Sequence, residues 1–235
     1  MKEYNKLSII IPVYNEESTV EMLIEKVKLI DIKNKTKEII VINDGSNDGS
    51  YEILRKIKGI KLFTHDVNLG KGAAIKTGLR HVSGGIVIIQ DADLEYDPNE
   101  IGKVIEPILD GRADFVYGSR ILKKGNIRGG FFFYFGGRFV SLITSLLFFR
   151  KISDSSTCYK AFKSDLIKGK KGKEIMINSN GFTWEHELTG KLLKDKKNRF
   201  LEVPISYVPR EISDGKKIRF LDGFKIICVL IKSRF

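Results

Sequence analysis

Two carboxylates separated by one residue, Asp91 and Asp93, are the clearest candidates for chemistry in this 235-residue chain. They follow an apolar run at 85–90, and residues i and i+2 at a strand end point to the same side. Like charges so close repel one another unless a cation compensates them. Hard oxygen ligands suit Mg²⁺ or Mn²⁺, so the pattern indicates a metal site, with Glu95 as a possible third ligand. A solvated turn is the alternative.

The elements that must position these carboxylates alternate between strand and helix over the first 120 residues. Runs rich in isoleucine and valine predict strands at 7–13, 38–43, 60–64, 85–90 and 113–118. Segments with helical spacing lie between them at 17–30, 48–58, 71–82 and 98–110. This alternation predicts an α/β fold with a mostly parallel central sheet flanked by helices. Ligands of such sheets bind beyond the carboxyl ends of the strands.

Composition and simple motifs limit the classes of partner that this chain is expected to bind, but they do not identify a substrate. The net charge of +12 favours phosphate-rich or other anionic partners, although lysine spread along the chain is also typical of a basic proteome. No helix-turn-helix, zinc-finger or RNP pattern is present, which argues against nucleic-acid binding. The two cysteines, Cys158 and Cys228, form no metal-ligand or disulfide pattern.

One long apolar stretch runs from Phe131 to Phe149 and approaches the length of a membrane span. Gly136, Gly137 and Arg138 interrupt it near the middle. The interruption favours a helix that lies at the membrane interface or packs on the domain over one that crosses the bilayer. An ordinary buried helix is the alternative.

Eight segments in register resemble the inverting family-2 glycosyltransferases of the GT-A (Rossmann-like) fold. They read IIIPVYNEE, VINDGSNDGS, NLGKGAAIKTG, IVIIQDADLEYDP, DFVYGSR, DSSTCYKAFKSD, GFTWEHELTGKL and VPISYVPREISDGKKIRFLDGFK. They cover nearly the whole chain and look similar to the polyprenyl-phosphate sugar synthases, the dolichyl-phosphate mannose or glucose synthase group. The resemblance implies a single domain over residues 1–235, with a nucleotide-sugar-binding half at 1–120 and an acceptor and membrane-interface half at 121–235.

The resemblance places the donor in the first half. The residues that match the family's nucleotide pocket are Pro12, Tyr14, Glu16 and Asp44. In the family the aspartate pairs with the base. Judged from the residues alone, Asp44 could instead simply form a turn that is followed by a helix N-cap. Asp91 and Asp93 match the metal motif, while many mannose synthases have glutamine in place of Glu95. Lys71, at a glycine-rich helix start, is a further donor-site candidate, with simple helix entry as its alternative.

Basic residues in the second half match a site for an anionic acceptor. Arg120 matches a family arginine that contacts the acceptor phosphate. Arg138 lies within the apolar stretch and needs a partner, which an acceptor phosphate at the interface or snorkelling to water would supply. The resemblance also places Arg210, Lys216 and Lys217 in a loop that closes over donor and acceptor, although a basic loop is otherwise usually only solvated.

Two glutamates, Glu185 and Glu187, stand at the family's E-x-E position. One of them could act as a base if the acceptor were a hydroxyl. A phosphate acceptor is already anionic at neutral pH, so in that case they would orient sugar hydroxyls or support the neighbouring loop.

Together these features predict a metal-dependent enzyme that transfers a sugar from GDP-mannose or a UDP-hexose to a polyprenyl phosphate with inversion, using Mg²⁺ or Mn²⁺. Asp93, Arg120 and Glu185 are the predicted catalytic residues. A family-2 enzyme acting on a saccharide hydroxyl in polysaccharide or glycan synthesis is the alternative. The expected location is cytoplasmic, with peripheral contact to the cytoplasmic face of a membrane. No sequence feature selects the sugar, the nucleotide or an oligomeric state.

Overall fold

The computed structural model describes residues 4–32, 35–126, 131–167, 177–210 and 222–235. Its first half follows the predicted alternation. The strands there are β1 (Lys6–Val13), β2 (Thr36–Asn43), β3 (Lys61–Thr64), β4 (Ile86–Ile89) and β5 (Phe115–Ser119). The helices are α1 (Val20–Leu29), α2 (Ser50–Leu54), α3 (Lys71–Arg80) and α4 (Ile101–Leu109), with a 3₁₀ turn at Pro98–Glu100 before α4.

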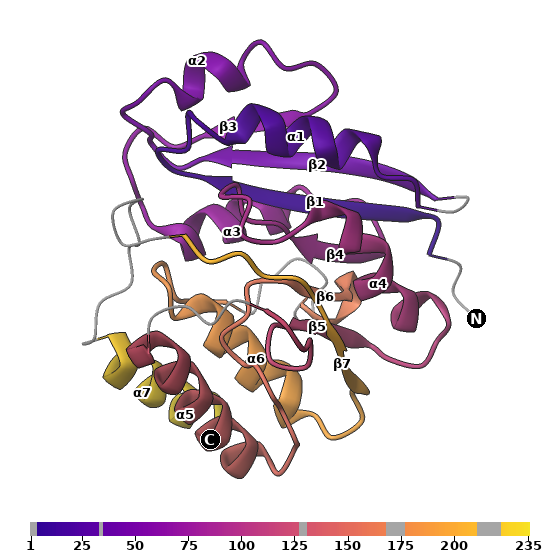
Figure 1. Ribbon diagram of the computed structural model, residues 1–235, viewed down its shortest axis with the longest axis vertical. Coiled ribbons are helices and arrows are strands. Elements are labelled where there is room, and N and C mark those ends of the chain that lie inside the picture. The colour runs from indigo at the N-terminus through magenta and orange to yellow at the C-terminus, as the bar shows by residue number, and fades with distance from the viewer. Residues whose placement is uncertain (1–3, 33–34, 127–130, 168–176, 211–221) are drawn as a thin grey trace.

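The second half completes the same sheet. Its elements are α5 (Phe131–Phe148), β6 (Lys160–Lys163), a 3₁₀ turn (Ser164–Leu166), α6 (Trp184–Lys194), β7 (Phe200–Pro204) and α7 (Asp222–Arg234). One seven-stranded sheet, in the order β3-β2-β1-β4-β6-β5-β7, joins both halves (Figure 1). Neighbouring strands pair in parallel except at β6, which is antiparallel to both β4 and β5. The predicted mostly parallel α/β fold is confirmed.

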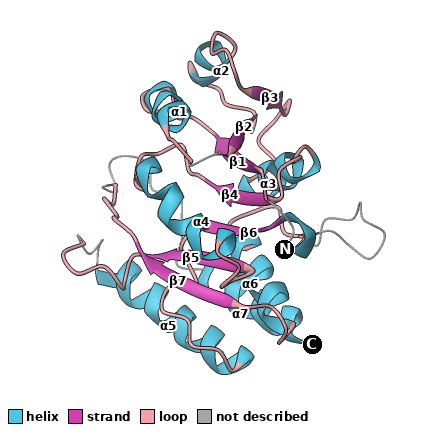
Figure 2. Ribbon diagram, turned by 90° about the vertical axis from the view of Figure 1, so that its right-hand side faces the viewer, coloured by secondary structure: helices cyan, strands magenta, loops and turns pink. Residues whose placement is uncertain are grey.

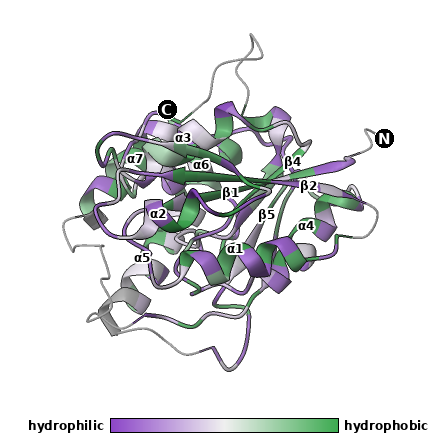
Figure 3. Ribbon diagram, turned by 90° about the horizontal axis from the view of Figure 1, so that it is seen from above, coloured by the Kyte–Doolittle hydropathy of each residue, from purple (hydrophilic) through white to green (hydrophobic). Residues whose placement is uncertain are grey.

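The core consists of two apolar layers, one on each face of the sheet. Successive strand residues point to opposite faces, so Ile9 and Ile11 of β1 join the layer under α1 and α4 while Ile10 joins the layer under α3 and α6. Figure 2 shows these two pairs of helices on opposite sides of the strands, and Figure 3 shows the apolar strands between the helices. Burial on both faces explains the continuous apolar runs at 9–13 of β1, 39–42 of β2 and 86–89 of β4.

The antiparallel β6 determines which chain segments meet at the functional edge. β5 is antiparallel to β6, which is antiparallel to β4, so β5 runs in the same direction as β1, β2 and β4. The carboxyl ends of these four strands therefore share one edge of the sheet. The amino end of β6 reaches that same edge, which brings the residues before β6 to the residues after β4 and β5.

Helices α5 and α7 lie side by side and pack with α6 (Figure 1). The helix predicted within the apolar stretch is therefore present. On α5 an apolar stripe remains exposed at helical spacing, consisting of Phe135, Phe139, Leu142 and Leu146. Within the described ranges, no helix combines the length and the apolar character needed to cross a membrane.

Candidate active site

The turn after β4 carries the two predicted metal ligands. Gln90 braces this turn, because its side-chain amide donates to the carbonyls of Asp91 (3.2 Å) and Tyr96 (3.4 Å). Leu94 has a φ of +62°, a left-handed conformation that a leucine adopts only where its surroundings enforce it. The side chain of Asp91 is only 9% exposed and Asp93 is partly buried. A freely solvated turn therefore does not describe this segment.

Lys71, the first residue of α3, pairs with Asp91. Its Nζ lies 2.7 Å from each oxygen of the Asp91 carboxylate. Only the contact with Oδ2 has hydrogen-bond geometry, and Oδ1 receives no hydrogen bond from any described residue. The same Nζ lies 3.2 Å from Sγ of Cys158. Lys71 therefore belongs to the buried polar cluster at this edge of the sheet.

The electrostatics of the two aspartates fit a divalent cation. Burial, together with the nearby charges of Asp91 and Glu95, raises the pKa of Asp93 to about 7. A cation would offset this repulsion and would bind Oδ1 of Asp91, which accepts no hydrogen bond from the described residues. Across the part of the chain that the structure describes, no three or more His, Cys, Asp or Glu side chains are grouped to hold a metal. The arrangement suits an ion shared between one or two carboxylates and substrate phosphates.

Glu95, the predicted third ligand, binds the segment that follows β7. Its carboxylate accepts hydrogen bonds from the Tyr207 hydroxyl (3.3 Å) and the Arg210 backbone N–H (2.8 Å). The Arg210 guanidinium in turn donates to the Glu16 carboxylate (2.7 Å) and the Asp93 carbonyl (3.0 Å). These contacts hold residues 207–210 against the turn after β4 and the end of β1. Metal ligation by Glu95 stays a prediction for a carboxylate that already has two protein partners.

The predicted nucleotide-pocket residues lie where β1 and β2 end. Those at the end of β1 are Pro12, Tyr14 and Glu16. Between them, Asn15 adopts a left-handed φ of +55°. Its backbone N–H donates to Oγ of Ser46 (3.0 Å), and its side-chain oxygen accepts from the Asn47 N–H (3.0 Å). The two quoted motifs that contain these residues therefore interlock in space.

Asp44, at the end of β2, ties that strand to the start of α3. Its carboxylate accepts hydrogen bonds from the backbone N–H groups of Leu69 (3.1 Å) and Gly70 (2.8 Å). Oδ1 also lies 2.7 Å from Nδ1 of His65, whose Nε2 lies 2.9 Å from Oγ1 of Thr77. Pairing of Asp44 with a base stays a prediction, while its contacts show a role in positioning the loop that leads to Lys71.

The glycines that flank Lys71 allow a close backbone approach. Gly70 has a φ of +95°, and a Cβ at Gly72 would lie 2.3 Å from the carbonyl oxygen of Ser179. The Asn180 carbonyl accepts a hydrogen bond from the first turn of α3. Glu187 fixes this partner segment, because its carboxylate accepts the Ser179 N–H at 2.8 Å. Glu187 therefore supports the segment at 178–179, while the predicted support of the loop that contains Arg210 stays a prediction.

Glu185 points the other way on α6, toward Cys158 in the segment before β6. Its Oε2 lies 3.3 Å from Sγ of Cys158, and burial raises the pKa of Glu185 to about 7, against the lowering effect of Lys160 and Lys71. Lys160 is itself fully buried, with Nζ 3.7 Å from the centroid of the Tyr117 ring, and burial lowers its pKa to about 8. A carboxyl group that titrates near neutral pH is suited to proton transfer.

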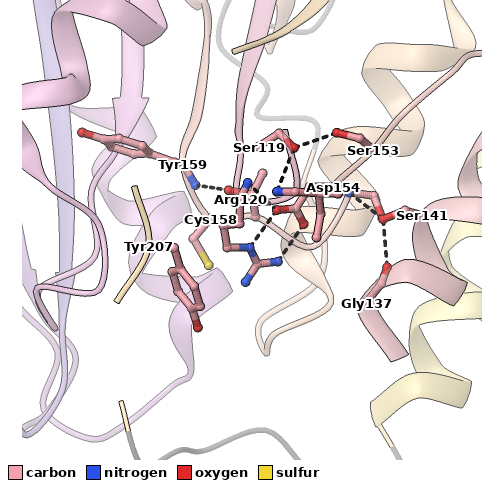
Figure 4. Close-up of polar contacts among 12 residues, drawn as sticks. Ser119, Arg120, Gly137, Ser141, Ser153, Asp154, Cys158, Tyr159 and Tyr207 are labelled. Carbon is pink, nitrogen blue, oxygen red and sulfur yellow. Dashed lines mark hydrogen bonds and ion pairs between the residues drawn. The ribbon is translucent and has the colours of Figure 1, made fainter. Parts of the chain in front are cut away.

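Arg120 follows β5 and is held in place by Asp154 (Figure 4). Nε and Nη2 of Arg120 each donate to one Asp154 carboxylate oxygen at 2.7 Å, and the Arg120 backbone N–H donates at 3.0 Å. Glu202 of β7 fixes the Asp154 turn by accepting the N–H groups of Ser153 (2.8 Å) and Asp154 (3.0 Å). The guanidinium carbon lies 5.1 Å from the Tyr207 ring centroid. A guanidinium oriented in this way is suited to bind a phosphate oxygen.

Sequence reasoning missed Asp154 and Cys158, although both lie in the quoted segment DSSTCYKAFKSD. Ligand-binding residues of a parallel sheet are expected after its strands, whereas both of these residues precede the antiparallel β6. Arg138 has an exposed side chain on α5, which fits snorkelling to water, so its contact with an acceptor stays a prediction. Lys216 and Lys217 lie outside the described residues.

Comparison with known proteins identifies the class. Residues 8–169, more than half of the chain, match glycosyl transferase family 2, and the chain belongs to that family. It is a glycosyltransferase with the GT-A fold.

Two relatives and one solved structure make the likeness more particular. The chain is 28% identical to a dolichol-phosphate mannosyltransferase of Pyrococcus furiosus, over 90% of its own length and 59% of the relative's. It is 27% identical to a UDP-N-acetylglucosamine–dolichyl-phosphate N-acetylglucosaminyltransferase of Methanococcus voltae, over 95% of its length and 94% of the relative's. It superposes with a TM-score of 0.73 and 18% identity on glucosyl-3-phosphoglycerate synthase from Mycobacterium tuberculosis, crystallised with Mn²⁺, UDP and phosphoglyceric acid, covering 98% of this chain and 78% of that one. The last likeness concerns the fold alone.

Proposed function

We propose that this enzyme transfers a hexose from GDP-mannose or a UDP-hexose to a dolichyl-type polyprenyl phosphate, with inversion at the anomeric carbon. The observation that carries the proposal is the pairing of two charged sites at one sheet edge. Buried carboxylates follow β4, and the guanidinium of Arg120, oriented by Asp154, follows β5. An oriented guanidinium beside a cation site suits an anionic acceptor, and both relatives named above use, by name, a dolichol or dolichyl phosphate.

On the donor side, Asp91 and Asp93 would hold Mg²⁺ or Mn²⁺ together with the diphosphate. The ion would supply Lewis-acid stabilisation of the charge that builds on the departing nucleoside diphosphate. Lys71 adds a positive charge beside Asp91. Arg210 bridges Glu16 and the Asp93 carbonyl, so it links the predicted nucleotide pocket to the metal turn.

On the acceptor side, Arg120 binds the phosphate and directs one oxygen to the face of the sugar opposite the leaving group. This oxygen is already anionic at neutral pH, so the attack needs no strong base. A single in-line displacement by a positioned nucleophile inverts the configuration, and most of the rate enhancement comes from positioning and electrostatic stabilisation. Glu185 would then orient the sugar hydroxyls.

Product extraction tests the proposal. The enzyme is incubated with radiolabelled GDP-mannose or UDP-glucose, Mn²⁺ and polyprenyl phosphate, and we expect the label in the organic-extractable lipid fraction. Arg120→Ala should abolish this product, whereas Arg112→Ala, which alters an exposed arginine paired with Asp110 before β5, should not. Label that appears only in water-soluble saccharide would contradict the proposal.

Transfer to a saccharide hydroxyl is the second candidate, because burial raises the pKa of Glu185 to about 7. A hydroxyl acceptor needs a base, so Glu185→Gln would then lower turnover by about 10²–10⁴-fold. A phosphate acceptor needs none, and the same variant should keep turnover within about tenfold of the wild type. Turnover of Glu185→Gln with each acceptor class therefore separates the two candidates.

We also propose that α5 and α7 rest on the cytoplasmic face of a membrane, where the lipid acceptor is presented. Phe139 and Leu146 of α5 are 57% and 65% exposed, and Phe224 of α7 is 74% exposed. The wild type should float with anionic vesicles that contain polyprenyl phosphate. The double variant Phe139→Asp, Leu146→Asp should not float, whereas Leu29→Asp, at an 83% exposed position that ends α1, should behave like the wild type. A wild type that stays with the unbound protein would contradict the proposal.

A further inference from the structure

The ammonium group of Lys71 is bound to the Asp91 carboxylate, which the proposed metal ion would also bind. Its Nζ is 2.7 Å from both oxygens of Asp91, and both side chains are largely buried, at 18% and 9% exposure. A second cation on that carboxylate would face Lys71 at short range in a buried setting, where repulsion is weakly screened. Lys71 and a metal ion therefore compete for Asp91.

Lys71 sits at a position where a positive charge is unfavourable for the helix. It is the first residue of α3, whose first turn contains no acidic residue, and the amino end of a helix carries partial positive charge. The close approach of Gly70 and Gly72 to the Ser179–Asn180 backbone fixes the helix start. The lysine's flexible four-carbon stem is the part that can move.

A second site for the ammonium is already within reach. Nζ lies 3.2 Å from Sγ of Cys158, which in turn lies 3.3 Å from the Glu185 carboxylate. Glu185 is buried and its charge lies close enough to favour the ammonium form of Lys71. A short movement away from Asp91 would therefore leave Lys71 near another carboxylate and beside the donor's diphosphate, not alone in an apolar environment.

We infer that Lys71 neutralises Asp91 in the donor-free enzyme and leaves it when a divalent cation binds, so that the lysine and the cation exclude one another on this carboxylate. The inference rests on the proposed function and adds the order in which the site fills. In the donor-free enzyme only the molecules in which Lys71 has left Asp91 can bind the metal there. The apparent metal affinity is therefore the intrinsic affinity multiplied by the fraction of such molecules. A nucleoside diphosphate supplies the displaced ammonium with phosphate oxygens, so it should strengthen metal binding, and the metal should strengthen nucleotide binding by the same factor.

The test measures Mn²⁺ binding by electron paramagnetic resonance, without nucleotide and with UDP or GDP. Lys71→Gln should bind Mn²⁺ about tenfold more tightly than the wild type in the absence of nucleotide, because the competing cation is gone. The gain in Mn²⁺ affinity caused by the nucleoside diphosphate should be smaller in Lys71→Gln than in the wild type. Lys26→Gln, an exposed lysine of α1, is the matched control and should follow the wild type in both series.

A folded Lys71→Gln variant whose Mn²⁺ affinity without nucleotide is equal to or weaker than that of the wild type would overturn the exchange. The wild type offers an independent check, since the rate at which Lys71 is reductively methylated can be followed by mass spectrometry. The rate should rise when saturating Mg²⁺ frees the amine from Asp91, and an unchanged rate would also overturn the exchange. Failure of the wild type to bind Mn²⁺ with or without UDP or GDP would remove the metal from the proposed function as well, whereas normal Mn²⁺–nucleotide binding with an unaltered Lys71→Gln would remove only the exchange.

Discussion

Buried carboxylates at the two edges of the sheet differ in how many hydrogen bonds they accept and in the direction in which their pKa is shifted. At the amino edge, Glu38 of β2 accepts hydrogen bonds from Ser8 (2.5 Å), from Lys61 (2.7 Å) and from three further groups, and its pKa falls well below the usual range. These three groups are the N–H and the hydroxyl of Ser83 and the N–H of Gly84. At the carboxyl edge, Asp93 has its pKa raised to about 7, and one oxygen of Asp91 receives no hydrogen bond from the described residues.

The same contrast holds at the far side of the sheet. Asp114, just before β5, is bound by Arg199 and Lys163, and its pKa is also strongly lowered. Carboxylates at the amino edge are thus fully paired within the protein and stabilise the fold. At the carboxyl edge, Asp93 and Glu185 are instead left with a charge that burial makes unfavourable and that a ligand can relieve. Functional sites often carry such local instability, which the rest of the fold offsets.

The largest expected effect is on catalysis at the carboxyl edge. Asp93→Asn should lower turnover by about 10³-fold, because one of the carboxylates proposed to bind the metal is lost, and with it the stabilisation of the departing diphosphate by that metal. The same change should leave thermal stability unchanged or raised, since it removes a destabilised charge. Turnover and melting temperature would be compared with those of Asp110→Asn, an exposed site. A stable Asp93→Asn variant with near-wild-type turnover would contradict a catalytic role for the carboxyl edge.

The reverse pattern is expected at the amino edge. Glu38→Gln should lower the free energy of unfolding by about 3 kcal/mol, because it breaks a buried, multiply bonded ion pair, while turnover per folded molecule stays unchanged. Since the folded-state pKa of Glu38 lies below that of the unfolded chain, this stabilisation is present at neutral pH and lost as the pH falls below about 4. Urea unfolding at pH 7 and pH 3 measures both parts. An equal loss at both pH values would count against the ion pair.

A pH dependence of opposite sign is expected from Glu185. Its folded pKa of about 7 exceeds the unfolded value of about 4.3, so the folded state holds the extra proton between these values. The contribution of Glu185 to stability should therefore fall as the pH rises from about 4 to about 7. Above pH 7, Glu185→Gln should exceed the wild type by on the order of 2 kcal/mol in urea unfolding.

The matched control lies two residues along the same helix. Glu187 pairs with Lys191 and accepts backbone hydrogen bonds from Asn178 (3.0 Å) and Ser179 (2.8 Å), and these contacts lower its pKa against the effect of burial. Glu187→Gln should therefore lose stability at neutral pH where Glu185→Gln gains it. Variants that shift in the same direction would show that both glutamates are structural.

The smallest effect concerns the paired exception at the carboxyl edge. Asp154 is paired with Arg120, and in the proposed function this cation binds the acceptor phosphate. Arg120→Lys keeps the charge but loses the bidentate geometry, so the KM for polyprenyl phosphate should rise about tenfold, equivalent to about 1.4 kcal/mol. The KM for the donor should remain near the wild-type value. A matching rise in the donor KM would indicate general damage to the active site.

The alternating half of the fold could be predicted from the sequence because it is governed by local pattern. Buried parallel strands are continuous apolar runs, and the helices between them keep a 3.6-residue period. The places of the candidate residues Asp93 and Arg120, after β4 and β5, followed from the same pattern together with the family motifs. In the second half, β6 has only four residues, KAFK, and carries no comparable signal.

Contacts between distant segments could not be predicted in this way. The Glu95 carboxylate meets Tyr207 and Arg210, more than a hundred residues along the chain, and no spacing rule reports such a pairing. The different roles of Glu185 and Glu187 depend on which face α6 turns to the segment before β6. The pairing of Lys71 with Asp91 likewise depends on how closely α3 approaches the segment at 179–180.

The insertion of β6 between β4 and β5 works as a spacer. Neighbouring strands lie about 4.8 Å apart, so the two strands that end in the metal turn and in Arg120 are separated by roughly 10 Å. That separation is on the scale of one sugar residue. If the leaving diphosphate binds beyond one strand and the attacking phosphate beyond the other, the strand order itself leaves room for one sugar residue between the two phosphate groups.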